Sequence, residues 1–203
     1  MLPELLEKAK LYHLLFVIDC DFSKRLKEKG CPFCNGTLHQ ADYPRKPRGP
    51  FKGLPEAYQK RHSLCCSCEN CRKRSLPPSC RFFGRRVYFW PVILIVMALR
   101  QNREKSYSTG RLMRLFKIHR NTLKRWFQFF KECFPLLPQW KRVRGFVPTD
   151  ITNHETPGRL FSFYLNRYSK NPMEAILKCL ILLTSEGDFS VKMDGFMLHA
   201  EDG

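Results

Sequence analysis

The sequence has few acidic residues for its size. Asp and Glu together number 18, against 36 Lys and Arg, so the formal net charge is +18 and the pI is about 9.7. A charge excess of this sign attracts polyanions, and nucleic acid is the commonest such partner. The alternative is a basic protein without a polyanionic partner. We find no basic amphipathic helix of the kind that lies on anionic membranes.

Long hydrophobic runs are also absent. The most apolar stretch is VYFWPVILIVMAL, residues 87–99. At about 13 residues it is too short to span a bilayer, which takes about 20, so it predicts a buried core helix. The N-terminus lacks the basic region and the small-residue cleavage site of a signal peptide. We therefore expect an intracellular protein with no membrane segment.

Patterns typical of an enzyme are missing as well. The sequence contains neither a nucleophile elbow nor a glycine-rich phosphate-binding loop. The part after residue 134 looks helical, and its few acidic residues have no strand context that would gather carboxylates around two Mg²⁺ ions. We therefore expect a non-enzymatic protein without catalytic residues.

Cysteine is plentiful, and its spacing indicates a metal site. Cys31 and Cys34 lie in the turn CPFCNG, and four more cysteines lie in CCSCENC, residues 65–71. A pair of cysteines on a tight turn places two thiolates on one side of a tetrahedral Zn²⁺ ion, and two such turns complete it. Clusters of this kind are typical of metal binding in a reducing compartment, although free or redox-active thiols are the alternative.

The second cysteine turn offers more ligands than the metal needs. Spacing alone favours Cys68 with Cys71, whereas Cys66 with Cys71 makes a slightly wider turn that also fits, and Cys65 is a bystander in both cases. The loop between the two turns is tolerable because closure entropy rises only logarithmically with loop length. Four thiolates leave no open position for a catalytic water, so we expect a structural zinc ion. His62 is expected in a loop or at the surface, with only a spare role as a ligand.

Basic residues are concentrated in the loops around these cysteines. Arg side chains match phosphate oxygens, and the neighbouring prolines stiffen the loops. The alternative is a solvated basic surface. Aromatic residues between them can stack on bases, although core packing is the safer interpretation for Phe82 and Phe83. The candidate phosphate contacts are Arg45, Lys46, Arg48, Arg72, Lys73, Arg74, Arg85 and Arg86, with Arg81 lying among them.

The stretch YSTGRLMRLFKIHRNTLKRWFQFFKECF, residues 107–134, predicts two short helices joined by a turn. The first is expected from about Thr109 to Phe116, the turn is KIHR, and the second begins near Arg120 and ends at about Cys133. The residues expected in their shared core are Leu112, Leu115, Ile118, Leu123, Trp126 and Phe130.

The second of these helices is expected to expose side chains suited to base edges and phosphates in a major groove. These DNA-contact candidates are Arg120, Asn121, Thr122, Lys124, Arg125 and Gln128. The alternative is a plain amphipathic helical hairpin. The segment IHRNTLKRW, residues 118–126, resembles the turn and recognition helix of the helix-turn-helix in transposases and integrases. Lys117 stands where that motif usually has glycine, and it need not adopt a positive φ.

A wider resemblance covers roughly residues 30–130. The segments CPFC with LHQADYPRKPRG, and CC with CRKRSLPPSCRFFGRRVY, are similar to small uncharacterised bacterial proteins found beside the recombinases of mobile elements. They are also similar in outline to the zinc ribbon of some insertion-sequence transposases. The resemblance implies Cys31, Cys34, Cys66 and Cys71 as the zinc ligands, with Cys68 as the alternative to Cys66. It also implies a cytoplasmic, nucleoid-associated protein of a bacterium.

Together, these patterns predict a mainly α-helical chain with a small β zinc ribbon. The expected parts are an N-terminal helix (1–29), a zinc-ribbon-like domain with basic loops (30–85), a helix-turn-helix domain (86–134), a helical C-terminal region (135–190) and a tail (191–203). Within the C-terminal region, residues 141–157 are expected as loop and residues 158–184 as helix.

The expected function is zinc-dependent DNA binding by an accessory or targeting factor of a transposon or recombinase system. The expected partners are double-stranded DNA and a transposase or recombinase. The alternatives are a truncated transposase remnant and an RNA-binding zinc-ribbon module.

Overall fold

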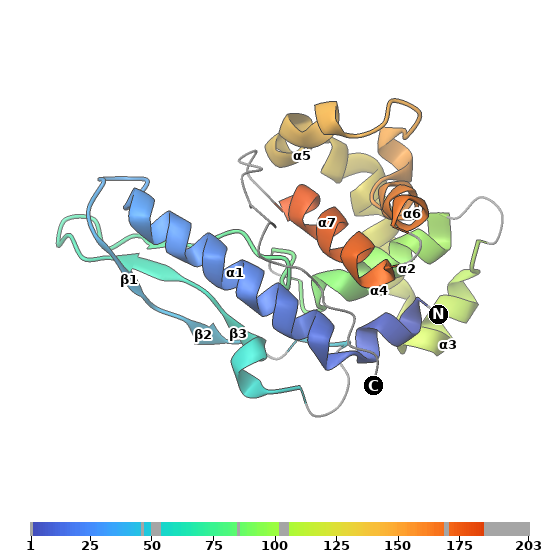
Figure 1. Cartoon of the computed structure of the whole chain (residues 1–203), viewed down its shortest axis with the longest axis horizontal. Coiled ribbons are helices and arrows are strands. Elements are labelled where there is room, and N and C mark those ends of the chain that lie inside the picture. The colour runs from blue at the N-terminus through green and yellow to red at the C-terminus, as the bar shows by residue number, and fades with distance from the viewer. Residues whose placement is uncertain are drawn as a thin grey trace.

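The computed structural model describes residues 2–45, 47–49, 54–84, 86–101, 106–168 and 171–184. Within them the chain is mainly helical with a small antiparallel sheet, as the sequence predicts. Figure 1 shows a body of helices from which α1 extends, with short strands lying alongside it. The predictions for Lys46, Arg85 and the tail 191–203 fall outside the described residues.

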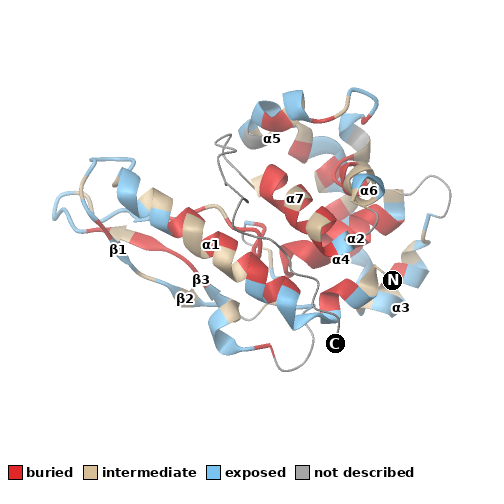
Figure 2. Ribbon diagram, viewed as in Figure 1, coloured by how far each residue is buried: buried red, intermediate tan, exposed pale blue. Residues whose placement is uncertain are grey.

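The N-terminal segment is helical, as predicted. A short 3₁₀ helix, η1 (Pro3–Glu7), precedes the long helix α1 (Ala9–Lys29), which ends at Gly30 with a positive φ of 80°. The leucines whose spacing predicts this helix are all buried: Leu5, Leu6, Leu11, Leu14 and Leu15. These leucines, in η1 and in the first half of α1, anchor the segment to the body, and Figure 2 shows buried positions along α1. The end of α1 leads directly into Cys31.

Along the chain, the described residues between α1 and α2 (Trp90–Gln101) form five short strands, and Figure 1 shows the labelled ones beside α1. The five strands are β1 (Leu38–Gln40), β2 (Tyr43–Pro44), β3 (Lys60–Arg61), β4 (Leu64–Cys66) and β5 (Arg74–Ser75), with the 3₁₀ helix η2 (Glu56–Gln59) before β3. Three of them form an antiparallel sheet in the order β1-β4-β5, and β2 pairs with β3. The register sets Leu38 opposite Cys66 and Tyr43 opposite Arg61, which fixes the positions of both groups of side chains described below.

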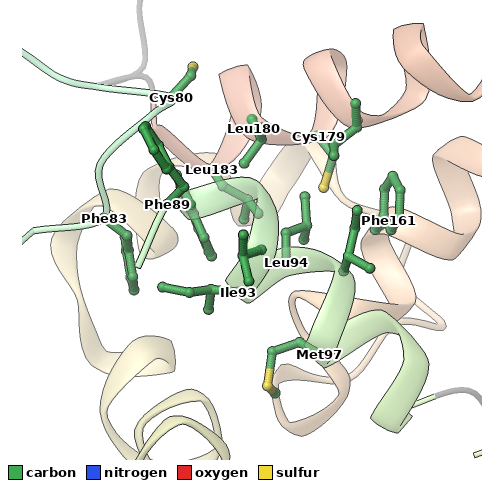
Figure 3. Close-up of a cluster of buried hydrophobic side chains, with 14 of the residues drawn as sticks. Cys80, Phe83, Phe89, Ile93, Leu94, Met97, Phe161, Cys179, Leu180 and Leu183 are labelled. Atoms are coloured by element: carbon green, nitrogen blue, oxygen red, sulfur yellow. The ribbon is translucent and has the colours of Figure 1, made fainter. Parts of the chain in front are cut away.

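The hydrophobic core of the body is centred on α2 (Trp90–Gln101), in which every residue from Trp90 to Leu99 is buried. The prediction of a core helix for the run 87–99 is therefore confirmed for residues 90–99, whereas residues 87–89 precede the helix and Val87 is exposed. Helices α6 (Gly158–Arg167) and α7 (Pro172–Thr184) pack on it, as predicted for the helical stretch 158–184. Figure 3 shows side chains of α2, α6 and α7 meeting in this core.

Helix α6 begins with a glycine because α2 lies too close for a side chain. A Cβ added at Gly158 would lie 2.6 Å from the carbonyl oxygen of Met97. The Gly158 amide donates a hydrogen bond to Gln101 Oε1 at 2.7 Å. Backbone therefore packs directly against backbone at this crossing.

A buried ion pair joins α1 to the segment that leads into α2. Asp19 and Arg81 are both fully buried, with Arg81 Nε 2.8 Å from Asp19 Oδ2. Asp19 also accepts hydrogen bonds from the Cys80 amide and the Ser79 hydroxyl, and Arg81 donates one to the carbonyl oxygen of Tyr58. Removing one member of such a pair leaves an uncompensated buried charge, so this contact fixes where α1 lies against the body.

The expected loop 141–157 is partly wrong. Helix α5 (Pro138–Val143) starts at a proline, which suits the first turn of a helix, and short 3₁₀ turns follow at Arg144–Phe146 and Asn153–Glu155. Trp140 is buried and donates its Nε1 hydrogen to Asn153 Oδ1 at 3.0 Å. The segment is therefore packed against the core.

The helix pair predicted around residues 107–134 is present. Helix α3 (Thr109–Phe116) and helix α4 (Arg120–Gln128) occupy the expected ranges, and a π-helical turn, η3 (Phe129–Cys133), continues α4. The buried residues are Leu112, Ile118, Leu123, Trp126 and Phe130. Leu115 is the exception to the predicted core, because it is 46% exposed.

Candidate metal centre

The two cysteine turns share one backbone design. In the first, the amide of Asn35 donates to the carbonyl oxygen of Cys31 at 2.8 Å, and Asn35 has a φ of 59°. In the second, the amide of Arg72 donates to the carbonyl oxygen of Cys68 at 3.0 Å, and Arg72 has a φ of 45°. A left-handed residue thus directly follows the last cysteine of each turn and turns the chain back toward the sheet.

The turns bring together the sulfur atoms of Cys31, Cys34, Cys66 and Cys71, all within 4.8 Å of one another. Cys31 and Cys71 Sγ are 3.8 Å apart, and Cys34 and Cys66 Sγ are 3.4 Å apart. In a tetrahedral zinc site with Zn–S bonds of about 2.3 Å, the sulfur atoms are about 3.8 Å apart. The four cysteines can therefore hold one metal ion, with a purely thiol donor set.

Hydrogen bonds to the sulfur atom favour the thiolate form at Cys31. Burial would raise the pKa of Cys31, but amides of Phe33 and Cys34 donate to its sulfur and bring the pKa down to about 7. Burial raises the pKa of Cys66. Only the thiolate form of cysteine binds a metal ion. A bound ion therefore takes the place of the protons that these four neighbouring thiols otherwise share.

Gly36 lies against the sulfur atoms, and because it has no side chain it leaves room for them. A Cβ at this position would lie 3.2 Å from Cys66 Sγ and 3.3 Å from Cys34 Sγ, which is tighter than ordinary van der Waals contact.

The apolar support around the sulfurs is small. The buried cluster consists of Cys31, Leu38, Leu64 and Cys66, with Leu26 and Cys71 packed against it, and it is separate from the large cluster of the helical body. A core of this size contributes little free energy of folding by itself. Bonds from the four thiolates to a metal ion are the natural source of the free energy that keeps the turns folded.

The other cysteines and the histidine of this region lie outside the sulfur group. Cys68 is exposed, and its amide donates to Cys66 Sγ at 3.4 Å, so it shapes the turn while its side chain faces solvent. Cys65 is directed toward the carbonyl oxygens of Cys66 and Arg72. His62 is not part of the sulfur group and lies between β3 and β4, in line with the expectation of a loop residue that is not a ligand, but it is buried and contacts Cys20 and Asp42.

The structure separates the predicted basic contacts into two groups. Arg48, Arg72, Lys73 and Arg74 are exposed. Arg45, by contrast, donates to the carbonyl oxygens of Gly84 and Arg86 at 2.8 and 3.0 Å. The Arg86 guanidinium lies over the rings of Phe83 and Phe129, at 4.4 and 3.9 Å from their centroids, and burial lowers its pKa. These two arginines hold segments of the protein together.

Helix α4 presents a polar face opposite its buried one. His119 caps its N-terminus by accepting a hydrogen bond from the Asn121 amide through Nδ1 at 3.2 Å. Leu123 and Trp126 face the core. Exposed on α4 are Arg120, Asn121, Lys124, Arg125 and Gln128, while Thr122 is partly exposed. Gln128 also donates to Glu132 Oε2 at 3.1 Å.

Lys117 ends α3 in the left-handed conformation, with a φ of 52°. The expectation that this residue need not adopt a positive φ does not hold in the structure. The tight reversal between α3 and α4 requires the conformation that glycine adopts most easily.

Comparisons of the chain with protein-family models, with curated proteins and with solved structures gave no match. Among the described residues, no helix combines the length and the apolar character needed to cross a membrane.

Proposed function

We propose that this chain is a non-enzymatic, zinc-dependent protein that binds duplex DNA. The observation that carries the proposal is the exposed face of α4, where cationic and amide side chains stand together on a helix that follows a tight turn. The net charge of +18 supports it, because a basic protein is drawn to the phosphate backbone before any base is read.

The metal in this proposal is Zn²⁺, held by Cys31, Cys34, Cys66 and Cys71. Four thiolates at tetrahedral spacing suit zinc better than the harder cations that prefer oxygen ligands. With every position filled by a thiolate, the ion has a structural role. The two cysteine turns at the end of the sheet β1-β4-β5 then form a zinc ribbon.

Helices α3 and α4 form a helix-turn-helix in this proposal. α4 would enter the major groove, with Asn121 suited to adenine and Arg125 to guanine, since these side chains can make paired hydrogen bonds to those bases. The exposed cations near the metal, Arg72, Lys73 and Arg74, would hold phosphates without reading the sequence.

Because we find no catalytic constellation in the sequence, we propose that the protein serves another protein's chemistry. A transposase or recombinase of a bacterial mobile element is the partner that the resemblance described above implies, and association with the nucleoid would follow from DNA binding. Co-purification of the tagged chain with such an enzyme from its native cell tests this part separately.

The test of DNA binding begins with selection of a preferred site from a pool of random duplexes, followed by affinity measurements at several salt concentrations. The Arg125→Ala change should weaken binding to the selected site by about 5- to 150-fold and relax the preference at one base pair, since a paired base contact is worth about 1–3 kcal/mol. Arg72→Ala should weaken all duplexes about equally.

Arg142→Ala is the matched control for these variants. Arg142 is exposed on α5, so the change removes the same charge from a surface that the proposal leaves free of DNA. Equal losses for Arg125→Ala and Arg142→Ala on every sequence would contradict base readout by α4.

A second candidate function is binding of single-stranded nucleic acid, favoured by one observation. Phe33 is 57% exposed at the tip of the first cysteine turn, with Lys73 Nζ 4.4 Å from its ring centroid. An exposed ring beside a cation is a platform on which a base can stack. If single strands bind more tightly than duplexes, and Phe33→Ala rather than Arg125→Ala abolishes that binding, the second function replaces the first.

A further inference from the structure

Outside the metal centre, a thiol, an imidazole and a carboxylate lie in line between α1 and the β2–β3 hairpin. Cys20 Sγ, on α1, is 3.5 Å from His62 Nε2. His62 Nδ1 is 2.9 Å from Asp42 Oδ2. Asp42 directly precedes β2 and His62 directly follows β3, so the antiparallel register that pairs Tyr43 with Arg61 sets the carboxylate beside the imidazole.

Asp42 is held as an oriented carboxylate. Its Oδ1 accepts a hydrogen bond from the Ser63 amide at 3.0 Å and another from the Gln40 side chain. Burial alone would raise the pKa of Asp42, but the hydrogen bonds from Ser63, His62 and Gln40 outweigh burial and hold it below its usual value. An ionised carboxylate only accepts hydrogen bonds, so His62 Nδ1 is the donor in this contact.

That proton assignment leaves the other ring nitrogen as a base. In a neutral imidazole with its proton on Nδ1, Nε2 is an acceptor, and it is Nε2 that faces Cys20. The His62 side chain is only 9% exposed and its ring packs on Phe16, with centroids 5.6 Å apart, so its orientation is fixed. Cys20 is partly exposed and therefore open to a reagent.

The surroundings of Cys20 favour the protonated thiol, so Cys20 needs a base before it can act as a nucleophile. Burial raises its pKa, Asp19 and Asp42 raise it further, and Arg81 opposes them. Asp19 is already paired with Arg81. A thiol of this kind becomes a nucleophile when a neighbouring base removes its proton during attack, which is the arrangement that His62 provides.

We propose that Cys20, His62 and Asp42 form a nucleophilic site that accepts an acyl group from an activated ester or thioester. Cys20 Sγ attacks the carbonyl carbon while His62 Nε2 takes its proton. A sulfur–carbon bond forms, the bond from carbon to the leaving oxygen or sulfur breaks, and the leaving group takes the proton from His62. No oxidant or reductant is needed. Asp42 is a positioning residue that holds the His62 ring and its tautomer.

The test uses the full-length, zinc-loaded protein with p-nitrophenyl acetate as the acyl donor and mass spectrometry of the digested chain as the readout. Cys133 is exposed and serves as the internal reference thiol. We expect Cys20 to be acetylated at least about tenfold faster than Cys133, because general-base assistance is worth about 10²–10⁴-fold. Similar rates at the two thiols in the native protein would overturn the proposal.

Two further measurements separate base assistance from a merely structural contact. In native protein, the acetylation rates of Cys20 and Cys133 should depend on pH in different ways, because His62 removes the proton from Cys20 during attack whereas Cys133 reacts only as its own thiolate. This readout needs no variant, so it holds even if a substitution unfolds the chain. Parallel pH profiles for both thiols would count against the site.

The His62→Gln change should slow acetylation of Cys20 about tenfold or more and leave Cys133 unchanged. His39→Gln is the matched control, since His39 is exposed on β1, where it pairs with Cys65. Asp42→Asn should give a smaller loss together with a shifted pH profile. A rate at Cys20 that stays the same or rises in His62→Gln contradicts the role of base. A second bound zinc that disappears in Cys20→Ser would mean that these side chains bind metal instead.

Discussion

Lys117 adopts a left-handed backbone conformation, which a residue with a side chain does not favour, because the turn between α3 and α4 requires it. The left-handed region is disfavoured for residues with a side chain because Cβ approaches the following carbonyl oxygen. Ser108 caps the start of α3 through its hydrogen bond from the Arg111 amide, and the reversal at Lys117 ends that helix. The turn is thus set by packing of α3 against α4 and not by the local preference of the lysine.

The Lys117→Gly variant should therefore be more stable than the native chain, by about 0.5–1 kcal/mol. Relief of backbone strain outweighs the extra freedom that glycine has in the unfolded state. The free energy of unfolding from denaturant titration measures the effect. The matched control is Lys124→Gly, which places the same change inside α4 and should destabilise by about 1 kcal/mol. Equal effects of the two changes would show that φ at Lys117 carries no strain.

At the scale of elements, the cysteine-bearing sheet differs from the helices in how it is stabilised. Its own buried cluster is small, whereas the cluster in the body joins side chains from η1 to α7. Helices of the body therefore have packing sufficient to persist by themselves, while β1, β4 and β5 are too short to do so without further constraint.

Removal of the metal by a chelator should unfold the cysteine turns and their strands and leave the helical body folded. Amide hydrogen exchange is the measurement: protection should fall in residues 31–40 and 64–75 and persist in α2, α6 and α7. Cys66→Ser should reproduce the loss and the bound zinc should fall, whereas Cys68→Ser, two residues away, should retain both. Unchanged protection of the turns after complete removal of zinc would refute a structural role for the metal.

The elements that the sequence predicted well are those whose signals are local. Leucine spacing gave α1, and the break in apolar period at KIHR gave the boundary between α3 and α4. Residues 141–157 were misjudged because the burial of Trp140 depends on Asn153 and on the core, which no local pattern records. Leu115 fits the helical period, yet the two-helix packing leaves it at the edge.

The two candidate sites also differ in how far local sequence patterns reveal them. Spacing alone identifies Cys31, Cys34 and Cys71, but it favours Cys68 as the fourth ligand, whereas the structure brings Cys66 to the group because of how the second turn folds. Cys20, Asp42 and His62 are about twenty residues apart along the chain and come together only through the hairpin register and the packing of α1. No spacing rule joins them, so the structure was required to find that group.

For the whole molecule, the turn that leads into α4 and the first cysteine turn lie at opposite ends of the N-terminal segment formed by η1 and α1. Pro3, Leu6 and Glu7 line a groove together with Leu115, Phe116 and Lys117, which places the end of α3 beside the start of the chain. The other end of α1 leads directly into Cys31. Figure 1 shows the same separation of α3 from β1 along the long axis. Since α1 has 21 residues, it is about 32 Å long, close to one turn of duplex DNA.

This arrangement predicts that DNA affinity depends on duplex length. On a duplex of about 10 base pairs only one surface can bind, whereas about 24 base pairs allow both to bind at once. The triple change Arg72→Ala, Lys73→Ala and Arg74→Ala should then reduce the salt dependence of binding to the long duplex. Each phosphate contact contributes about 0.9 to the magnitude of the slope of log affinity against log salt, so the loss of three contacts should reduce that magnitude by up to about 2.7. The slope on a short duplex carrying the selected site, which α4 alone would occupy, should change little. Equal changes on both lengths would mean that the metal end and α4 do not share one duplex, and the proposal of two cooperating surfaces would fail.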